Sequence, residues 1–134
     1  MRRAIPFLLI ASAAAAGELV DYEVLNAREI PAPLVEAAGD GEAVMARAGC
    51  LDCHNRKLDT APDLETVGER LSAGEIRLMV VEPRVRFPET AMPAYYAPGV
   101  HGVDPDEMVG RTRLSAAEIE AVVAYLSRRS ATEK

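Results

Sequence analysis

The feature that most constrains this chain is a C-x-x-C-H segment, Cys50-Leu51-Asp52-Cys53-His54. Over one helical turn the two thiols face the same side, and the adjacent imidazole lies next to them. Thiols at this spacing can add across the two vinyl groups of one haem, and the histidine can then bind the iron as the proximal ligand. The motif therefore predicts one covalently bound haem c, attached through Cys50 and Cys53, with His54 as an axial ligand.

Three other interpretations of the motif do not involve haem. A thioredoxin-like redox pair requires C-x-x-C near a βαβ pattern, and no useful strand pattern occurs in the sequence. A zinc site would have the four ligands it needs in Cys50, Cys53, His54 and His101. However, Cys53 and His54 are neighbours in the chain, and neighbouring residues fit poorly as two ligands of one tetrahedral zinc ion. A local disulfide leaves His54 unexplained. Haem is therefore the preferred interpretation.

The second axial ligand has to come from elsewhere in the chain. Met92 lies in a proline-containing loop, where Pro93 keeps it out of helical geometry and allows its thioether to face a flat ring. His101 is the next choice. The other methionines are less suited, because two lie in helical patterns typical of a core and one in an acidic stretch: Met45, Met79 and Met108. A His/Met pair raises the reduction potential and saturates the iron, which favours electron transfer.

Several further residues are candidates for supporting the haem. A proximal histidine usually donates its second N–H to an acceptor, and the carbonyl of Pro62 follows the motif after a short polar loop. Tyr95 and Tyr96 are expected either to pack at the haem edge or to bond a propionate, unless they only anchor the loop. Arg84 and Arg86 can pair with propionates, although arginines spaced by two more often form a solvated face.

Size, charge and composition exclude some functions. The chain has 134 residues, which is one ordinary domain at most. Its net charge is −6 and no basic cluster occurs, so a nucleic-acid interface is not expected. Aromatic residues make up only 4% and tryptophan is absent, so the core is short of large rings. Small domains of this kind often depend on a bound group for stability.

The N-terminus has the pattern of a signal peptide. Two arginines precede the apolar stretch 4–16, which ends in Ala14-x-Ala16. A membrane anchor is the alternative, but the stretch is shorter than the roughly 20 residues of a spanning helix. We therefore expect a periplasmic protein with no membrane association after cleavage. The expected division is a signal peptide over 1–16, an extended arm over 17–39 and a haem domain over 40–130.

The rest of the sequence predicts helices joined by irregular loops. Four helices are indicated by caps or by apolar stripes at helical spacing: 41–48 after Asp40, 64–71 begun by Pro62 and Asp63, 76–82 after the capping box 72–75, and 119–126 after the capping box 115–118. The arm contains Pro31 and Pro33, which favour extended backbone, so it is either a strap over the domain or a partner-facing arm. The loop 82–114 is long enough to suggest a function.

Five segments of the chain together resemble the SoxX family of monohaem cytochromes: 30–34, 67–71, 78–83, 88–96 and 114–126. The most specific of them contains Met92-Pro93-Ala94-Tyr95-Tyr96. The resemblance implies an all-α class I cytochrome c fold, with three to five helices around a covalent haem and an extended N-terminal arm. It also implies that Cys50 and Cys53 hold the haem, and that His54 and Met92 are its axial ligands.

The same resemblance implies a function in thiosulfate oxidation. In the family, SoxX pairs with SoxA, a larger monohaem or dihaem cytochrome that carries a cysteine persulfide. The complex joins thiosulfate oxidatively to a carrier cysteine on SoxYZ, as an L-cysteine S-thiosulfotransferase, and electrons leave to a small cytochrome. Because Cys50 and Cys53 are both used for haem, this chain is expected to relay electrons and to have no catalytic residue of its own. The alternative is a free, diffusible monohaem electron carrier.

Overall fold

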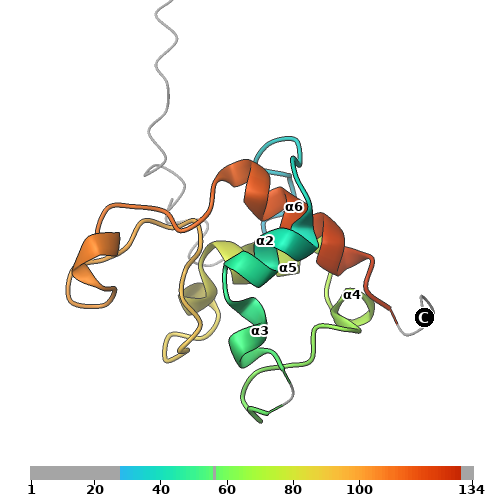
Figure 1. The fold of residues 1–134 in the computed structure, drawn as a ribbon, viewed down its shortest axis with the longest axis horizontal. Helices are drawn as coiled ribbons and strands as arrows, with labels where there is room; N and C mark the ends of the chain where they lie inside the picture. The colour runs from blue at the N-terminus through green and yellow to red at the C-terminus, as the bar shows by residue number, and fades with distance from the viewer. Residues whose placement is uncertain (1–27, 56, 131–134) are drawn as a thin grey trace, which may run out of the picture.

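The computed structural model describes residues 28–55 and 57–130, and within them the regular structure is helical (Figure 1). The α-helices are α2 (Gly41–Arg47), α3 (Cys50–Cys53), α4 (Val67–Arg70), α5 (Ala73–Val81) and α6 (Ala116–Ser127). Two short 3-10 helices, η1 (Pro83–Val85) and η2 (Asp106–Met108), lie in the loop before α6. The only pairing of strand type in this part of the chain is an isolated bridge between Gly99 and Val109. The predicted all-α class is confirmed, and the predicted signal peptide lies outside the described residues.

The core forms where α6 packs against α2, α4 and α5. The apolar face predicted for α6 is buried, with Ile119, Val122, Val123 and Leu126 each at most 5% exposed. Met45 joins this core as predicted, whereas Met79 is only half-buried. None of the described helices is long and apolar enough to cross a membrane.

The crossing of α2 and α6 is close because Gly41 has no side chain. A Cβ at this position would overlap the carbonyl oxygen of Ala121 and lie 2.6 Å from the Cβ of Tyr125. Both contacts are with atoms that cannot swing away, since one belongs to the backbone and the other to the root of a side chain. The glycine therefore sets the distance between the two helices.

Replacing Gly41 with alanine is expected to destabilise the protein by about 1–3 kcal/mol, the usual cost of overpacking. Without such crowding, alanine would stabilise the helix relative to glycine by about 1 kcal/mol. A loss of stability would therefore indicate crowding at the helix crossing, and a gain would indicate its absence. The free energy of unfolding by denaturant measures it. Ala46→Ser, on the exposed face of α2, is the control. A more stable Gly41→Ala protein would contradict the close crossing.

Three of the predicted helix starts are confirmed by their caps. The Asp40 side chain accepts from the backbone N–H groups of Glu42 and Ala43. Both predicted capping boxes are complete, with Ser72 and Glu75 before α5 and Ser115 and Glu118 before α6: each serine accepts from the backbone of its glutamate, and each glutamate from that of its serine.

The prediction for 64–71 is wrong at its start, because α4 begins only at Val67. Neither Pro62 nor Asp63 starts this helix. The Pro62 carbonyl is 2.8 Å from the His54 ring, and an Asp63 carboxylate oxygen accepts from the Glu65 N–H at 2.9 Å. These two bonds belong to a turn that precedes the helix. The polar groups of Pro62 and Asp63 are therefore engaged in that turn and do not cap α4.

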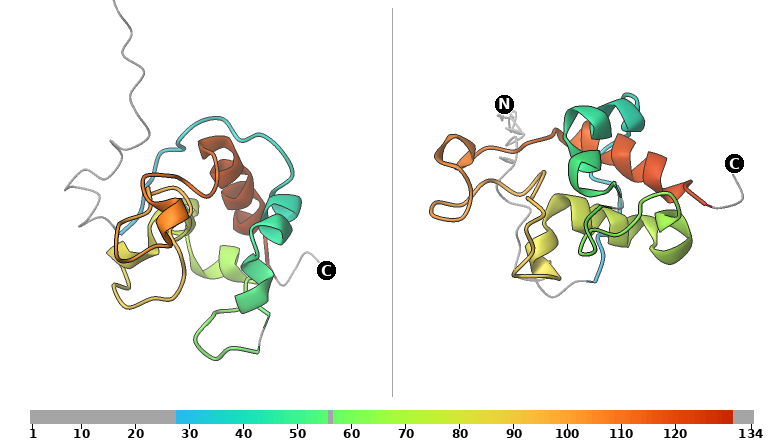
Figure 2. Two further views of the ribbon diagram at one scale, coloured as in Figure 1. Left: turned by 60° about the vertical axis from the view of Figure 1, so that its left-hand side comes forward. Right: turned by 60° about the horizontal axis from the view of Figure 1, so that its bottom comes forward.

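The described part of the arm, 28–39, is a strap over its own domain (Figure 2). The Ile30 N–H donates to the Gly74 carbonyl at 3.0 Å at the start of α5. Further along, the Leu34 N–H donates to a Glu120 carboxylate oxygen at 2.8 Å in the middle of α6. The arm therefore crosses both helices before the chain enters α2.

A buried ion pair lies beneath this strap. Arg77 on α5 donates from Nε and Nη2 to the two carboxylate oxygens of Glu120 on α6, at 2.7 and 2.9 Å. The two side chains are 4% and 5% exposed. Arg77 Nη1 also donates to the Ile30 carbonyl at 2.6 Å. The pair therefore joins α5, α6 and the arm, and it satisfies polar groups of all three.

Candidate haem site

The first four residues of the haem-attachment motif form α3, which follows α2 after Ala48 and Gly49. Gly49 takes a left-handed conformation, with φ of +76°, where an L side chain would be strained. The chain thus turns sharply, and the Asp52 N–H donates to the Gly49 carbonyl at 3.1 Å to begin a new turn. Cys50 and Cys53 are the two ends of this one turn, and neither forms a disulfide. Cys50 is half-buried, whereas Cys53 is exposed.

His54 is oriented by the carbonyl of Pro62, as the sequence predicted. The His54 Nδ1 lies 2.8 Å from that oxygen. A carbonyl can only accept, so Nδ1 carries the proton and donates it. In the neutral imidazole with this tautomer, the lone pair is on the other ring nitrogen, Nε2. This is the orientation and tautomer that a metal-binding histidine needs.

Cys50 packs against the core cluster that contains Tyr95. Burial raises the pKa of the Cys50 thiol, and a hydrogen bond from the Tyr95 side chain acts in the opposite direction. Burial, together with the neighbouring Cys50, raises the pKa of Tyr95 to about 12. Both groups are therefore neutral at neutral pH. The sequence suggested a haem-edge or propionate role for Tyr95 but did not suggest this partner.

The loop that carries Met92 is anchored on both sides. On one side, the N–H groups of Tyr95 and Ala97 donate to carbonyls of Val80 and Val81 at the end of α5, at 3.0 and 3.1 Å. On the other, the Tyr95 carbonyl accepts from the backbone just before α6. Met92 itself is half-buried and packs against the core. His101, the other candidate for this ligand, is exposed on the segment 99–111.

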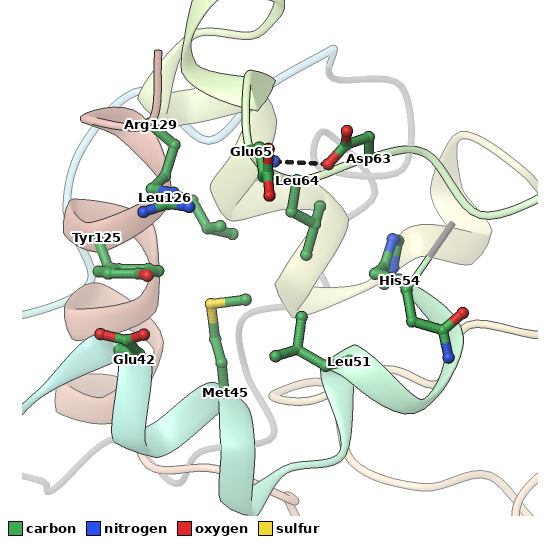
Figure 3. Close-up of a pocket in the computed structure, with 11 residues that line it drawn as sticks. Glu42, Met45, Leu51, His54, Asp63, Leu64, Glu65, Tyr125, Leu126 and Arg129 are labelled. Carbon is green, nitrogen blue, oxygen red and sulfur yellow. Dashed lines mark hydrogen bonds between the residues drawn. The ribbon is translucent and has the colours of Figure 1, made fainter. Parts of the chain in front are cut away.

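A cavity of about 310 Å³ opens beside His54 (Figure 3). Met45, Leu51 and Leu64 point toward its centre, and charged groups such as Glu42 and Arg129 lie around it. Its lining includes His54 but neither cysteine and not Met92. The cavity therefore lies on the His54 side of the candidate haem site, and it is only one part of that site.

Arg84 is engaged by carboxylates in this structure. Its Nε and Nη2 donate to the two oxygens of Glu82 at 2.6 and 2.8 Å, and its Nη1 donates to Asp104 at 3.1 Å. The bond to Glu82 is the main cause of a raised pKa for this guanidinium. Arg86 donates to the Arg28 carbonyl at 3.0 Å. Arg84 thus ties η1 to the segment 99–111, and its propionate role stays a prediction.

These residues fit a covalently bound haem. Two thiols stand one turn apart, the imidazole beside them has its Nε2 free, and the Met92 loop is held in place. The zinc alternative is not supported, because no three His, Cys, Asp or Glu side chains among the described residues are grouped to hold a metal ion. The donor set is that of a c-type haem protein.

Comparison with known proteins agrees with this class. Residues 38–130 match the cytochrome c family, so the chain belongs to that family and carries covalently bound haem c. It is an electron-transfer haem protein with the predicted class I fold. The structure is similar to a chain of the crystal structure of SoxXA from P. pantotrophus, with 27% identity and a TM-score of 0.61. The match covers 77% of this chain and 90% of that one, which confirms the SoxX resemblance. No curated protein matches the chain.

Proposed function

We propose that this chain is the electron-relay subunit of a periplasmic SoxAX-type complex. The observation that carries the proposal is the likeness to a SoxXA chain over 90% of that chain's length. The partner is then a SoxA-like haem subunit, and the complex couples thiosulfate oxidatively to a cysteine of a SoxYZ-like carrier. A small cytochrome accepts the electrons. The signal-peptide pattern at residues 1–16 supports the periplasmic location.

Each residue of the candidate site has its own role in binding the haem. Cys50 and Cys53 would hold the haem through their sulfurs, and its iron would be bound by His54 through Nε2 and by Met92 through its thioether. Pro62 keeps the histidine ring oriented through its carbonyl. When bound, the haem supplies reversible one-electron chemistry at its iron. With His54 and Met92 both bound to the iron, this chain would leave no iron position for a sulfur substrate, so we assign the sulfur chemistry to the partner.

A free electron carrier is the second candidate function, and the arm does not argue against it. If the proline-rich arm served only to contact a partner, a free electron carrier would have no need of it. The described part of the arm, 28–39, instead bonds to α5 and α6 of its own domain. The arm therefore has a structural use in either case, and it does not distinguish a subunit from a carrier.

The native mass of the protein decides between these two functions. The chain, tagged at its C-terminus, is isolated gently from its own periplasm and examined by native mass and haem staining. A subunit is expected to run with a larger haem-staining chain, and the purified pair should then oxidise thiosulfate in the presence of the carrier. A haem-bearing species that runs alone at the monomer mass, even after mild cross-linking of whole cells, would favour the free carrier.

Replacing Met92 with alanine is expected to leave the haem covalently attached and to remove the sulfur-to-iron charge-transfer band of the oxidised protein. The reason is that the thioether is the source of this band, whereas attachment depends on the cysteines. The absorption spectrum and the mass of the protein measure the two effects.

Met108→Ala is a matched control, because Met108 is also a half-buried methionine in the loop before α6. His101→Ala tests the other candidate ligand. If the band survives in Met92→Ala, Met92 is not the ligand. A band or spectrum altered only in His101→Ala would transfer the assignment to His101.

A further inference from the structure

Met92 lies between two main-chain anchors of its loop. Before it, the Phe87 N–H donates to the Pro83 carbonyl of η1 at 2.9 Å. After it, the Tyr95 N–H donates to the Val80 carbonyl of α5 at 3.0 Å. These bonds hold the loop on either side, five residues before Met92 and three residues after it. The conformation of Met92 itself therefore depends on contacts that are closer in the chain.

A threonine two residues before Met92 supplies such a contact. The Thr90 N–H donates to the Phe87 carbonyl at 3.0 Å, which closes a turn. The Met92 N–H then donates to the Thr90 Oγ1 at 3.1 Å. Serine and threonine hydroxyls often stabilise a turn by bonding the backbone two residues further on. The side chain of Thr90 thus joins this turn to the backbone of the proposed iron ligand.

The residue after Met92 restricts the backbone in a different way. Pro93 has no N–H, so it cannot donate a bond of this kind. Its ring instead disfavours helical geometry at Met92. Thr90 and Met92 are both half-buried, so water competes with their hydrogen bond only in part. The backbone of Met92 is therefore restricted by a hydrogen bond from one side and by a proline ring from the other.

We propose that Thr90 is a positioning residue, whose Oγ1 accepts from the Met92 N–H and so orders the backbone of Met92 for binding to the haem iron. This inference rests on the proposed ligation by Met92. In this role Thr90 acts through Met92 and does not itself bind the haem. A backbone that is ordered beforehand loses less conformational entropy when the thioether binds, which strengthens the ligation.

The variant Thr90→Val tests this role, because valine keeps the branched shape of threonine but has no hydroxyl to accept the bond. Loss of one hydrogen bond should weaken the binding of the thioether to the iron by roughly two- to tenfold. The probe is imidazole, a good ligand for iron that competes with the thioether. We expect the imidazole concentration that half-removes the charge-transfer band of the oxidised holoprotein to fall by that factor.

Two controls separate this role from a general effect of the substitution. Thr90→Ser keeps the hydroxyl and loses only a methyl group, so it should titrate like the wild-type protein. Thr66→Val removes the hydroxyl of another half-buried threonine, which makes no side-chain bond at the start of α4. It should also leave the imidazole titration unchanged. Masses of all variants should show the haem attached.

The outcomes distinguish this inference from the ligation on which it rests. A shift in Thr90→Val alone supports the positioning role. If Thr90→Val titrates like the wild-type protein, the positioning role is wrong and Met92 ligation stands. If Thr90→Ser or Thr66→Val shifts the titration as much as Thr90→Val, the hydrogen bond is not the cause and the positioning role is again wrong. If the wild-type protein has no charge-transfer band, Met92 ligation fails, and the inference fails with it.

Discussion

Replacing Cys50 and Cys53 together with alanine is expected to give a chain that carries no covalent haem and does not fold cooperatively. The two thiols are the free cysteines on α3, and the sequence contains no other cysteine. Of the described residues, only one aromatic side chain, Tyr95, is among the buried apolar ones, so the protein core itself is small in aromatic area. Burial of the haem ring supplies apolar contact that the side chains lack.

Two measurements test this result. The mass of the purified protein reports the attached haem, and thermal melting followed by circular dichroism reports cooperative folding. The single variant Cys50→Ala should keep at most one thioether, through Cys53. Asp52→Asn is the matched control, since Asp52 is an exposed residue between the two cysteines. A double variant that still melts cooperatively without haem would show that the haem is not needed for the fold.

Replacing Glu120 with alanine is expected to lower the free energy of unfolding of the holoprotein by about 3–5 kcal/mol. The variant leaves the Arg77 guanidinium buried without its carboxylate, at a place where the two side chains are 4% and 5% exposed. It also removes the acceptor of the Leu34 N–H, so the arm loses one of its attachments. Denaturant unfolding measures the loss, and faster proteolysis within 28–39 should accompany it.

The chain offers a control ion pair with a similar shortest distance and very different burial. Arg47 and Glu118 form an ion pair at 2.8 Å, but their side chains are 58% and 31% exposed. Arg47→Ala should therefore cost no more than about 1 kcal/mol. The double variant Arg77→Met, Glu120→Leu removes both charges and should recover much of the stability. If Glu120→Ala costs as little as Arg47→Ala, the buried pair is not important for the fold.

The local features of this protein could be predicted from its sequence. The haem motif, the Asp40 cap and the two capping boxes all depend on residues within four positions of one another. Groups so close in the chain meet in almost any fold that contains the helix, so their spacing is sufficient evidence. The same holds for the apolar face of α6, since the helical period places its residues together. Together with the loop around Met92, these features identified the family before the fold was known.

The long-range pairings were decided by the tertiary structure alone. Arg77 and Glu120 are 43 residues apart, and each lies in a helix with an apolar face. A charged residue in such a helix indicates that a buried partner exists, but the sequence does not identify which residue it is. Tyr95 is bonded to the end of α5 only because the chain folds back there. Arg84 meets Asp104, 20 residues further along the chain, only in the folded protein. These pairings depend on how the helices cross and on which elements the loops pack against. No local pattern in the sequence contains that information.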